Sequence, residues 1–232
     1  MEAMGAGKSL RDEKLAPWPR TPQAVQLHRQ EYFALITHMD EQIGKILAEL
    51  ERTGQADKTY IVMTADHGLA CGQHGLLGKQ NMYEHSLKAP LLVAGPGIPA
   101  GKRIDAPVYI QDFVATALEW AGSQQPAHVE FKSLLPLIRG ERSQQYELIY
   151  GAYEKNKQRM VRRDQMKLIH YPTVDKFEVY DLSQDPHEMH DLSHSAQYAD
   201  KFKDLQADLK TIMQSMDDPL LRVTKVSPTP AK

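Results

Sequence analysis

The chain predicts an α/β fold in which a layered domain with a mainly parallel sheet precedes a small antiparallel sheet and a C-terminal helix. Helical spacing and short β-branched runs alternate in the first part, in the order helix, strand, loop, strand, helix. From about residue 143 the runs become closely spaced strands separated by turn signals. The expected division is an irregular segment (1–20), the α/β domain (21–142), the small sheet with its helix (143–222) and a disordered tail (223–232).

The first helix is predicted from its two ends and from its apolar spacing. Thr21 is placed as the N-cap, with Pro22 at the first helical position and Gly54 just beyond the C-terminus. The apolar positions step by three and four and predict one buried stripe: Tyr32, Ile36, Met39, Ile43, Ile46 and Leu50. At ~1.5 Å per residue the helix would run roughly 45 Å, so a kink or break near its start is expected.

The remaining elements follow from shorter patterns. Thr59–Thr64 is too short and too β-branched for a helix, and is typical of a strand covered on both faces. Further strands are expected at Pro90–Ala94, Glu147–Ala152, Arg159–Ile169 (with a turn at Asp164-Gln165) and Phe177–Leu182. Helices are expected at Gln111–Ala121, ending at Gly122, and at Gln197–Met216.

Composition excludes several classes of protein. With 28 basic and 30 acidic residues, the net charge of -2 argues against a dedicated nucleic-acid binder. The sequence contains neither an apolar run long enough for a bilayer nor the apolar region of a signal peptide, so we expect no membrane partner. For the sequence as given, the lack of both features indicates the cytoplasm, while a periplasmic location stays open for a longer form. The single cysteine, Cys71, excludes an intramolecular disulfide and a cysteine-rich metal site.

The most informative residues follow the strand at Thr59–Thr64. Asp66 and His67 stand at its carboxyl end, where ligands gather in open α/β sheets, and Gly68 allows a tight turn there. A carboxylate beside an imidazole can hold a cation. From the dipeptide alone, Asp66 could instead cap a helix or turn and His67 could lie in a surface loop. Lys79 then arrives from a glycine-rich loop and could neutralise an anionic substrate.

Several stretches around these residues resemble one family. TADHG (64–68), GQHGLLGK (72–79) and YEHSLKAPLLVAGPG (83–97) are similar to the metal-binding and sulfate-binding segment of the sulfatases, the arylsulfatase-like members of the alkaline-phosphatase-like superfamily. RRDQMK (162–167) resembles the family's R-x-D-x-x-K strand, and VYDLSQDPHEMHDL (179–192) resembles its L-Y-D-L-x-x-D-P-x-E-x-x-N-L turn. The resemblance covers roughly residues 20–195 in the family's order and corresponds to its C-terminal half. It implies part of an alkaline-phosphatase-like α/β/α sandwich.

The resemblance also implies roles for individual residues. Asp66 and His67 would bind a divalent cation, usually Ca²⁺ in this family, although an imidazole ligand also suits Mn²⁺ or Zn²⁺. Lys79 would contact the sulfate oxygens. His74 would line the pocket or act on the leaving group, or it would only tie its loop through a backbone hydrogen bond. Glu84 is expected to orient the helix after Lys79 rather than touch substrate.

Two parts of the family's site are missing from this sequence. No C/S-x-P-x-R motif, the source of the formylglycine nucleophile, occurs, and Cys71 has neither the proline nor the arginine of that motif around it. No Asp-Asp pair follows a strand before Asp66. We therefore expect metal-dependent hydrolysis of sulfate esters to which this chain supplies cation ligands and a sulfate contact, the isolated chain being inactive.

The expected partners are a sulfated small molecule or sugar and the missing N-terminal half. Two alternatives stay open. One is a phosphodiesterase or phosphonate hydrolase of the same superfamily, and the other is a non-catalytic, truncated module that binds a ligand.

Overall fold

The computed structural model describes residues 4 and 7–223, which form two compact units, each interrupted in sequence. The sheet unit comprises the described parts of Met1–Leu15, Gly78–Leu87 and Tyr146–Lys232. The helix unit comprises Ala16–Leu77 and Lys88–Gln145. The expected disordered tail lies outside the described residues from 224 onward. No helix in the described part of the chain is long and apolar enough to cross a membrane.

The sheet unit is built on four antiparallel strands that follow one another in chain order, as expected. Asp164, in the left-handed region at φ 53°, turns the second strand into the third. The strands are β3 (Ile149–Tyr153), β4 (Gln158–Arg163), β5 (Met166–Tyr171) and β6 (Lys176–Asp181).

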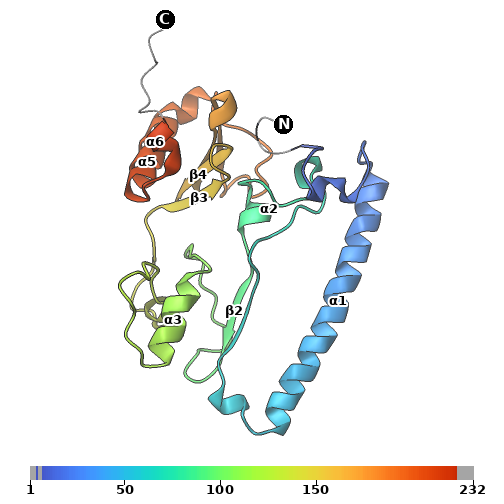
Figure 1. The fold of residues 1–232 in the computed structure, drawn as a ribbon, viewed down its shortest axis with the longest axis vertical. Coiled ribbons are helices and arrows are strands. Elements are labelled where there is room, and N and C mark those ends of the chain that lie inside the picture. Colours follow the sequence, from blue (N-terminus) through green and yellow to red (C-terminus); the bar gives the residue numbers. More distant parts are fainter. Residues whose placement is uncertain (1–3, 5–6, 224–232) are drawn as a thin grey trace, which may run out of the picture. The chain divides into compact units, whose positions relative to one another are not determined.

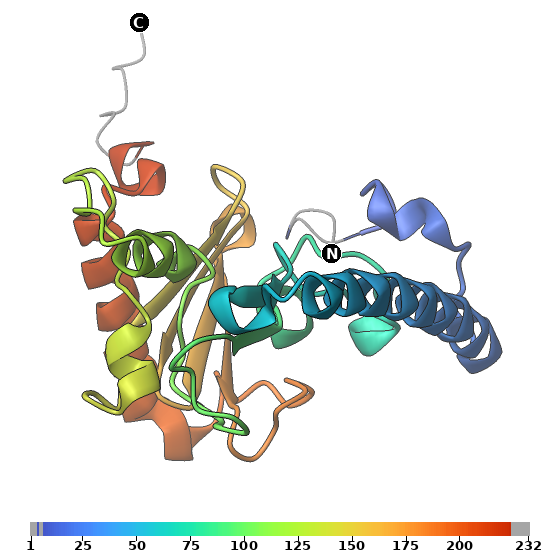
Figure 2. The same cartoon turned by 90° about the horizontal axis from the view of Figure 1, so that it is seen from below.

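Both faces of this sheet are covered, because successive side chains of a strand point to opposite sides. Figure 2 shows α5 (Ala199–Ser215) along one face, where Leu205, Leu209 and Met213 pack on Val161, Leu168 and Val179. The other face carries a second cluster to which the segment Gly78–Leu87 contributes, with its short helix α2 (Glu84–Leu87). This second cluster contains Met82, Met160, Ile169, Tyr171, Tyr180 and Leu182. The chain closes with α6 (Pro219–Val223).

In the helix unit, α1 (Pro22–Arg52) begins and ends where the sequence predicts. The Thr21 hydroxyl accepts the Ala24 N–H at 3.2 Å, and Gly54 follows the last turn at φ 67°. The helix is continuous over its 31 residues, so the break expected near its start is not found (Figure 1). The prediction of a buried stripe is also wrong. All residues of α1 are described and none of them is buried; Ile46, for example, is 68% exposed. Apolar spacing provides a face for packing, but no described element covers that face.

The two strands of the helix unit are β1 (Ile61–Thr64) and β2 (Leu91–Ala94), which pair antiparallel with Ile61 opposite Ala94. The α/β class and the C-terminal sheet with its helix are confirmed, but the mainly parallel arrangement is not found among the described strands. Parallel pairing needs a crossover, usually a helix, and residues 65–90 contain only short helical turns. Met63 of β1 is 39% exposed and Leu92 of β2 is 62% exposed, so the expectation that Thr59–Thr64 is covered on both faces is wrong as well.

The core of the helix unit lies at the helices after β2. These are α3 (Asp112–Trp120), close to its expected bounds, and α4 (Leu135–Arg139), which the sequence did not predict. Leu134, Leu135, Leu137 and Ile138 form the core cluster. Across both units, the described part of the chain also contains short 3₁₀ turns at Asp12–Leu15, Ala56–Lys58, Gln73–Gly75, Pro172–Val174 and Ala196–Tyr198.

Candidate functional site

Asp66 and His67 lie in contact just after β1. The Thr64 hydroxyl donates to the Pro90 carbonyl at 2.8 Å, which ties the end of β1 to the start of β2. His67 Nε2 lies 3.2 Å from Asp66 Oδ2. The Asp66 side chain is 84% exposed and that of His67 is 33% exposed, so the pair is open to solvent and to ligands.

The second ring nitrogen of His67 determines what this pair can bind. His67 Nδ1 lies 2.7 Å from the Gly68 carbonyl oxygen. Because a carbonyl only accepts, Nδ1 carries the hydrogen, and the Nε2 lone pair of a neutral ring faces the Asp66 carboxylate. Two acceptors at this distance repel each other unless a cation or a proton lies between them. The pair therefore fits either an imidazolium–carboxylate ion pair or two ligands of one divalent cation, with the ring orientation held by a backbone carbonyl as in metal sites.

These two donors would fill only part of a coordination shell. No group of three or more His, Cys, Asp or Glu side chains with metal-binding geometry occurs among residues 4 and 7–223. Ca²⁺ takes about six to eight oxygen ligands. Any cation held by Asp66 and His67 thus needs further donors from solvent, substrate or another polypeptide segment.

His74 lies in a tightly defined turn of the helix unit. It adopts a left-handed conformation at φ 53° and ψ 18°, which is uncommon for residues other than glycine. Gly72 precedes it at φ 104°, and a Cβ built there would lie 2.4 Å from Val25 Cγ1. Arg20 Nη1 donates to the Gly75 carbonyl at 2.8 Å. The turn that carries His74 is therefore fastened to the start of α1.

Lys79 belongs to the sheet unit and follows a residue that is held by a buried carboxylate. The Gly78 N–H donates to Glu13 Oε1 at 2.8 Å, and Glu13 is 2% exposed. The Arg11 guanidinium, hydrogen-bonded to Asp12, holds the pKa of that carboxyl below its usual value, and the Lys79 charge adds a smaller effect in the same direction. The structure thus brings Asp66 and His67 together, places His74 in the same unit, and places Lys79 in the other.

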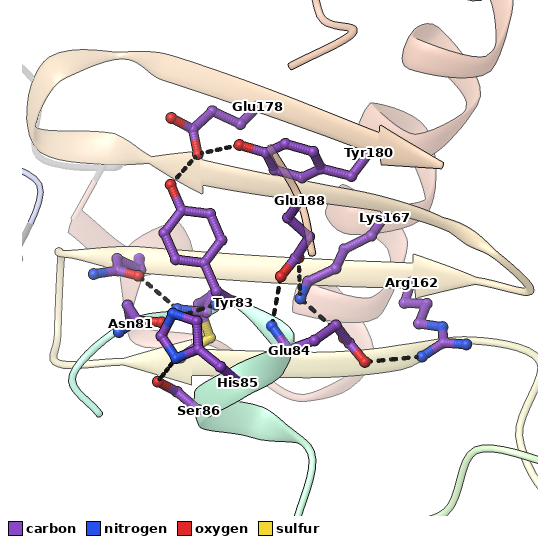
Figure 3. A network of polar contacts seen from close by, with 12 residues as sticks. Asn81, Tyr83, Glu84, His85, Ser86, Arg162, Lys167, Glu178, Tyr180 and Glu188 are labelled. Atoms are coloured by element: carbon purple, nitrogen blue, oxygen red, sulfur yellow. Dashed lines mark hydrogen bonds and ion pairs between the residues drawn. The ribbon is translucent and has the colours of Figure 1, made fainter. Parts of the chain in front are cut away.

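Sequence reasoning missed a polar cluster behind α2, which Figure 3 shows. We call Glu84, Arg162, Lys167 and Glu188 the ion cluster. Lys167 Nζ lies 3.0 Å from Glu84 Oε1 and 2.7 Å from Glu188 Oε1. Arg162 Nη1 lies 3.3 Å from Glu84 Oε2. Lys167 is fully buried, so its charge is neutralised by protein groups rather than by water.

A second buried carboxylate lies beside the ion cluster. Glu178 Oε2 accepts hydrogen bonds from the hydroxyls of Tyr83, Tyr171 and Tyr180 at 3.0, 3.0 and 3.1 Å (Figure 3 labels Tyr83 and Tyr180). Burial raises the pKa of Tyr171 and Tyr180 far above the usual phenol value, with nearby Tyr83 and Glu178 adding to the rise, so both hydroxyls stay protonated and donate. This second group therefore ties Tyr83, just before α2, to β5 and β6.

Comparison with known families gives two matches on this chain. The family model described as N-sulphoglucosamine sulphohydrolase, C-terminal, matches residues 72–215. The model described as Sulfatase matches residues 11–123. Together they include Asp66, His67, Lys79 and all four members of the ion cluster.

Individual relatives agree with these matches. The N-acetylglucosamine-6-O-sulfatase of Bacteroides thetaiotaomicron is 34% identical over 208 residues, covering 83% of this chain and 37% of the relative. A solved structure in complex with its substrate D-glucosamine-2-N,6-O-disulfate is 32% identical with a TM-score of 0.79, covering 84% of this chain and 42% of that one. The phosphonate monoester hydrolase of Silicibacter pomeroyi is 25% identical with a TM-score of 0.71, covering 95% of this chain and 46% of that one.

The matched chains are much longer than this one. The chain spans between 35% and 39% of the length of the first curated relatives that it matches.

Proposed function

The chain belongs to the sulfatase family, and we propose that it supplies cation ligands and a sulfate contact to the hydrolysis of sulfate esters. The observation that carries this proposal is the Asp66–His67 pair. Asp66 Oδ2 and His67 Nε2 lie 3.2 Å apart at the end of β1, within the stretch that matches the family.

In this proposal Asp66 Oδ2 and His67 Nε2 bind one divalent cation. Ca²⁺ is the first candidate, and the nitrogen ligand makes Mn²⁺ and Zn²⁺ the alternatives. When bound, the cation supplies a positive charge that polarises the sulfate ester. The Lys79 ammonium contacts the sulfate oxygens and offsets the charge that they carry.

We assign His74 a place in the substrate pocket, where its imidazole lines the site or acts on the leaving group. The left-handed conformation in a fastened turn supports this role, because sparsely populated backbone conformations cluster at functional sites. The same turn could exist only to tie the loop. Replacement of His74 by Asn, which tolerates the left-handed region, separates the two when sulfate-ester turnover is measured with the nucleophile-bearing segment present: a loop role leaves turnover unchanged, and a chemical role lowers it.

The nucleophile is not assigned to this chain, because its sequence contains no C/S-x-P-x-R motif. We propose that a segment equivalent to the N-terminal half of the longer relatives supplies it, and that this chain alone gives no turnover. The substrate proposed is a sulfated small molecule, a sulfated sugar before others. The support is a relative named as an N-acetylglucosamine-6-O-sulfatase and a solved neighbour bound to a disulfated glucosamine.

A phosphonate hydrolase remains the second candidate, and one observation favours it. A phosphonate monoester hydrolase shares this fold at 25% identity. Turnover of both substrate classes, measured on the protein purified from its native source, would distinguish the two functions. Faster turnover of phosphonate monoesters or phosphodiesters than of sulfate monoesters would replace the sulfatase assignment.

The proposal is tested by titrating the chain with Ca²⁺, Mn²⁺ and Zn²⁺ in a calorimeter. We expect one cation to bind the wild type, and Asp66→Asn to weaken it at least about tenfold, as loss of a charged ligand should. Asp57→Asn, at an exposed aspartate nine residues earlier, is the matched control and should bind as the wild type does. Equal binding by Asp66→Asn and wild type would remove Asp66 from the site.

A further inference from the structure

Three stretches that are far apart in the sequence meet in the ion cluster. Glu84 follows Lys79 by five residues, Arg162 and Lys167 flank the turn between β4 and β5, and Glu188 lies in the loop after β6. Each stretch is one of those that resemble the family in sequence. Their convergence shows that these charged positions form one structural device rather than three separate surface features (Figure 3).

The ion cluster fastens α2 to the sheet by both side chain and backbone. Lys167, fully buried, contacts one carboxylate from α2 and one from the loop after β6. The Glu84 N–H also donates to Glu188 Oε2 at 2.6 Å. Two cations face two anions, so the cluster is neutral. Buried ion pairs often stabilise a fold no more than apolar residues would, which favours a role in fixing geometry.

A second anchor holds the same segment closer to Lys79. Gln158, at the start of β4, is fully buried. Its Oε1 accepts the Met82 N–H at 3.0 Å, and its Nε2 donates to the Gln80 carbonyl at 3.3 Å. One side-chain amide thus pairs with two backbone groups of the segment, much as a neighbouring strand would. Gln158, Arg162 and Lys167 lie on the same face of the sheet, the face to which Met82 packs.

Lys79 lies between two tied residues. Gly78 before it is held by Glu13, and Gln80 after it is held by Gln158. Its own carbonyl accepts the Asn81 N–H at 2.8 Å. The backbone of Lys79 is therefore fixed from both sides by groups that belong to the sheet unit.

We propose that Gln158 and Lys167 are positioning residues, through which the four-stranded sheet holds Lys79 in place for its anion. The proposal rests on the role of Lys79 given above, but it assigns a function to a sheet that carries none of the expected site residues. Gln158 and Lys167 act through the segment Gly78–Leu87 and touch no reacting group.

The test combines amide hydrogen exchange with binding of inorganic sulfate, on the full chain. Gln158→Met and Lys167→Met each remove one anchor at similar side-chain volume. Gln214→Met and Lys210→Met, at exposed positions of α5, are the matched controls. We expect amides 79–84 to exchange about 10- to 100-fold faster in the anchor variants, while β5 and β6 keep their protection.

Sulfate affinity supplies the readout that a merely structural role would leave unchanged. Each anchor variant should weaken sulfate binding roughly 3- to 10-fold, and the two controls should not. In a Lys79→Met background, Gln158→Met should cause no further loss, because its effect passes through Lys79.

Three results would overturn the proposal: equal acceleration of exchange in all four strands, unchanged sulfate affinity despite a loosened segment, or additive losses in the double variant. A wild type without sulfate affinity would instead contradict the role of Lys79 itself. The two failures are therefore distinguishable.

Discussion

The two units differ in how far their apolar patterns are buried. In the sheet unit, α5 covers one face and the segment Gly78–Leu87 covers the other, so Val161, Leu168 and Ile169 are fully buried. In the helix unit, α1 has an equally regular stripe, yet none of its residues is buried. The contrast teaches that an apolar period determines which side of an element can pack, whereas burial depends on a second layer that the pattern does not describe.

The same contrast holds for the functional residues. Asp66 and His67 are open to solvent, while the residues proposed to position Lys79 are buried and paired. Open donors can take ligands from outside, whereas buried Lys167 contacts the carboxylates of Glu84 and Glu188. Under the proposed function, the helix unit would present the cation ligands and the sheet unit would hold the residue that contacts the anion.

The largest expected effect compares matched truncations in the two units. Leu209→Ala, in α5 at 4% exposure, should lower the free energy of unfolding by about 2–5 kcal/mol, because it removes buried methyl groups and leaves a cavity. Ile46→Ala, in α1 at 68% exposure, should change it by less than about 0.5 kcal/mol. Urea denaturation followed by circular dichroism measures both. If Ile46→Ala lowered the free energy of unfolding as much as Leu209→Ala does, α1 would be covered in solution, and the difference between the two units would not hold.

A smaller expected effect is a loss of stability of the sheet unit at acid pH, which depends on the carboxyl of Asp218. Burial alone would raise the pKa of Asp218, but hydrogen bonds from Arg159, at 2.8 Å, and from Tyr150 outweigh it and lower the pKa below its usual value. A carboxyl with a lowered folded-state pKa contributes stability that is present above its unfolded pKa of about 3.9 and is lost as pH falls through the folded value.

The pH dependence is measured as the urea midpoint between about pH 2 and pH 6. Asp218→Asn should be less stable than the wild type near neutrality and should lose less stability on acidification. Asp200→Asn, whose side chain is 98% exposed, is the control and should follow the wild type. Parallel curves for Asp218→Asn and wild type would contradict the assignment.

How much could be predicted from the sequence depended on how local each feature is. The start of α1 at Thr21 and its end before Gly54 follow from capping, which involves only neighbouring residues. The contact between Asp66 and His67 follows from their adjacency. The antiparallel direction of β1 and β2 does not, because it depends on the path of the intervening chain.

The ion cluster likewise could not be predicted from local sequence patterns. Glu84 and Lys167 are 83 residues apart, and Lys167 and Glu188 are 21 apart, so only the strand register and the packing of α2 bring them together. The motif resemblance marked each stretch but did not show that they meet. Whether α1 is buried could not be predicted for a similar reason, since it depends on what lies opposite its stripe.

The most direct test of Asp66 and His67 as cation ligands is the ¹⁵N NMR spectrum of the His67 ring during titration with Ca²⁺, Mn²⁺ or Zn²⁺. We expect Nδ1 to keep its hydrogen, bonded to the Gly68 carbonyl, while one cation shifts or broadens the Nε2 signal. Asp66→Asn should suppress that change. An Nε2 signal that responds to pH but to none of the three cations would show that the pair is an imidazolium–carboxylate contact, and would contradict the assignment of Asp66 and His67 as cation ligands.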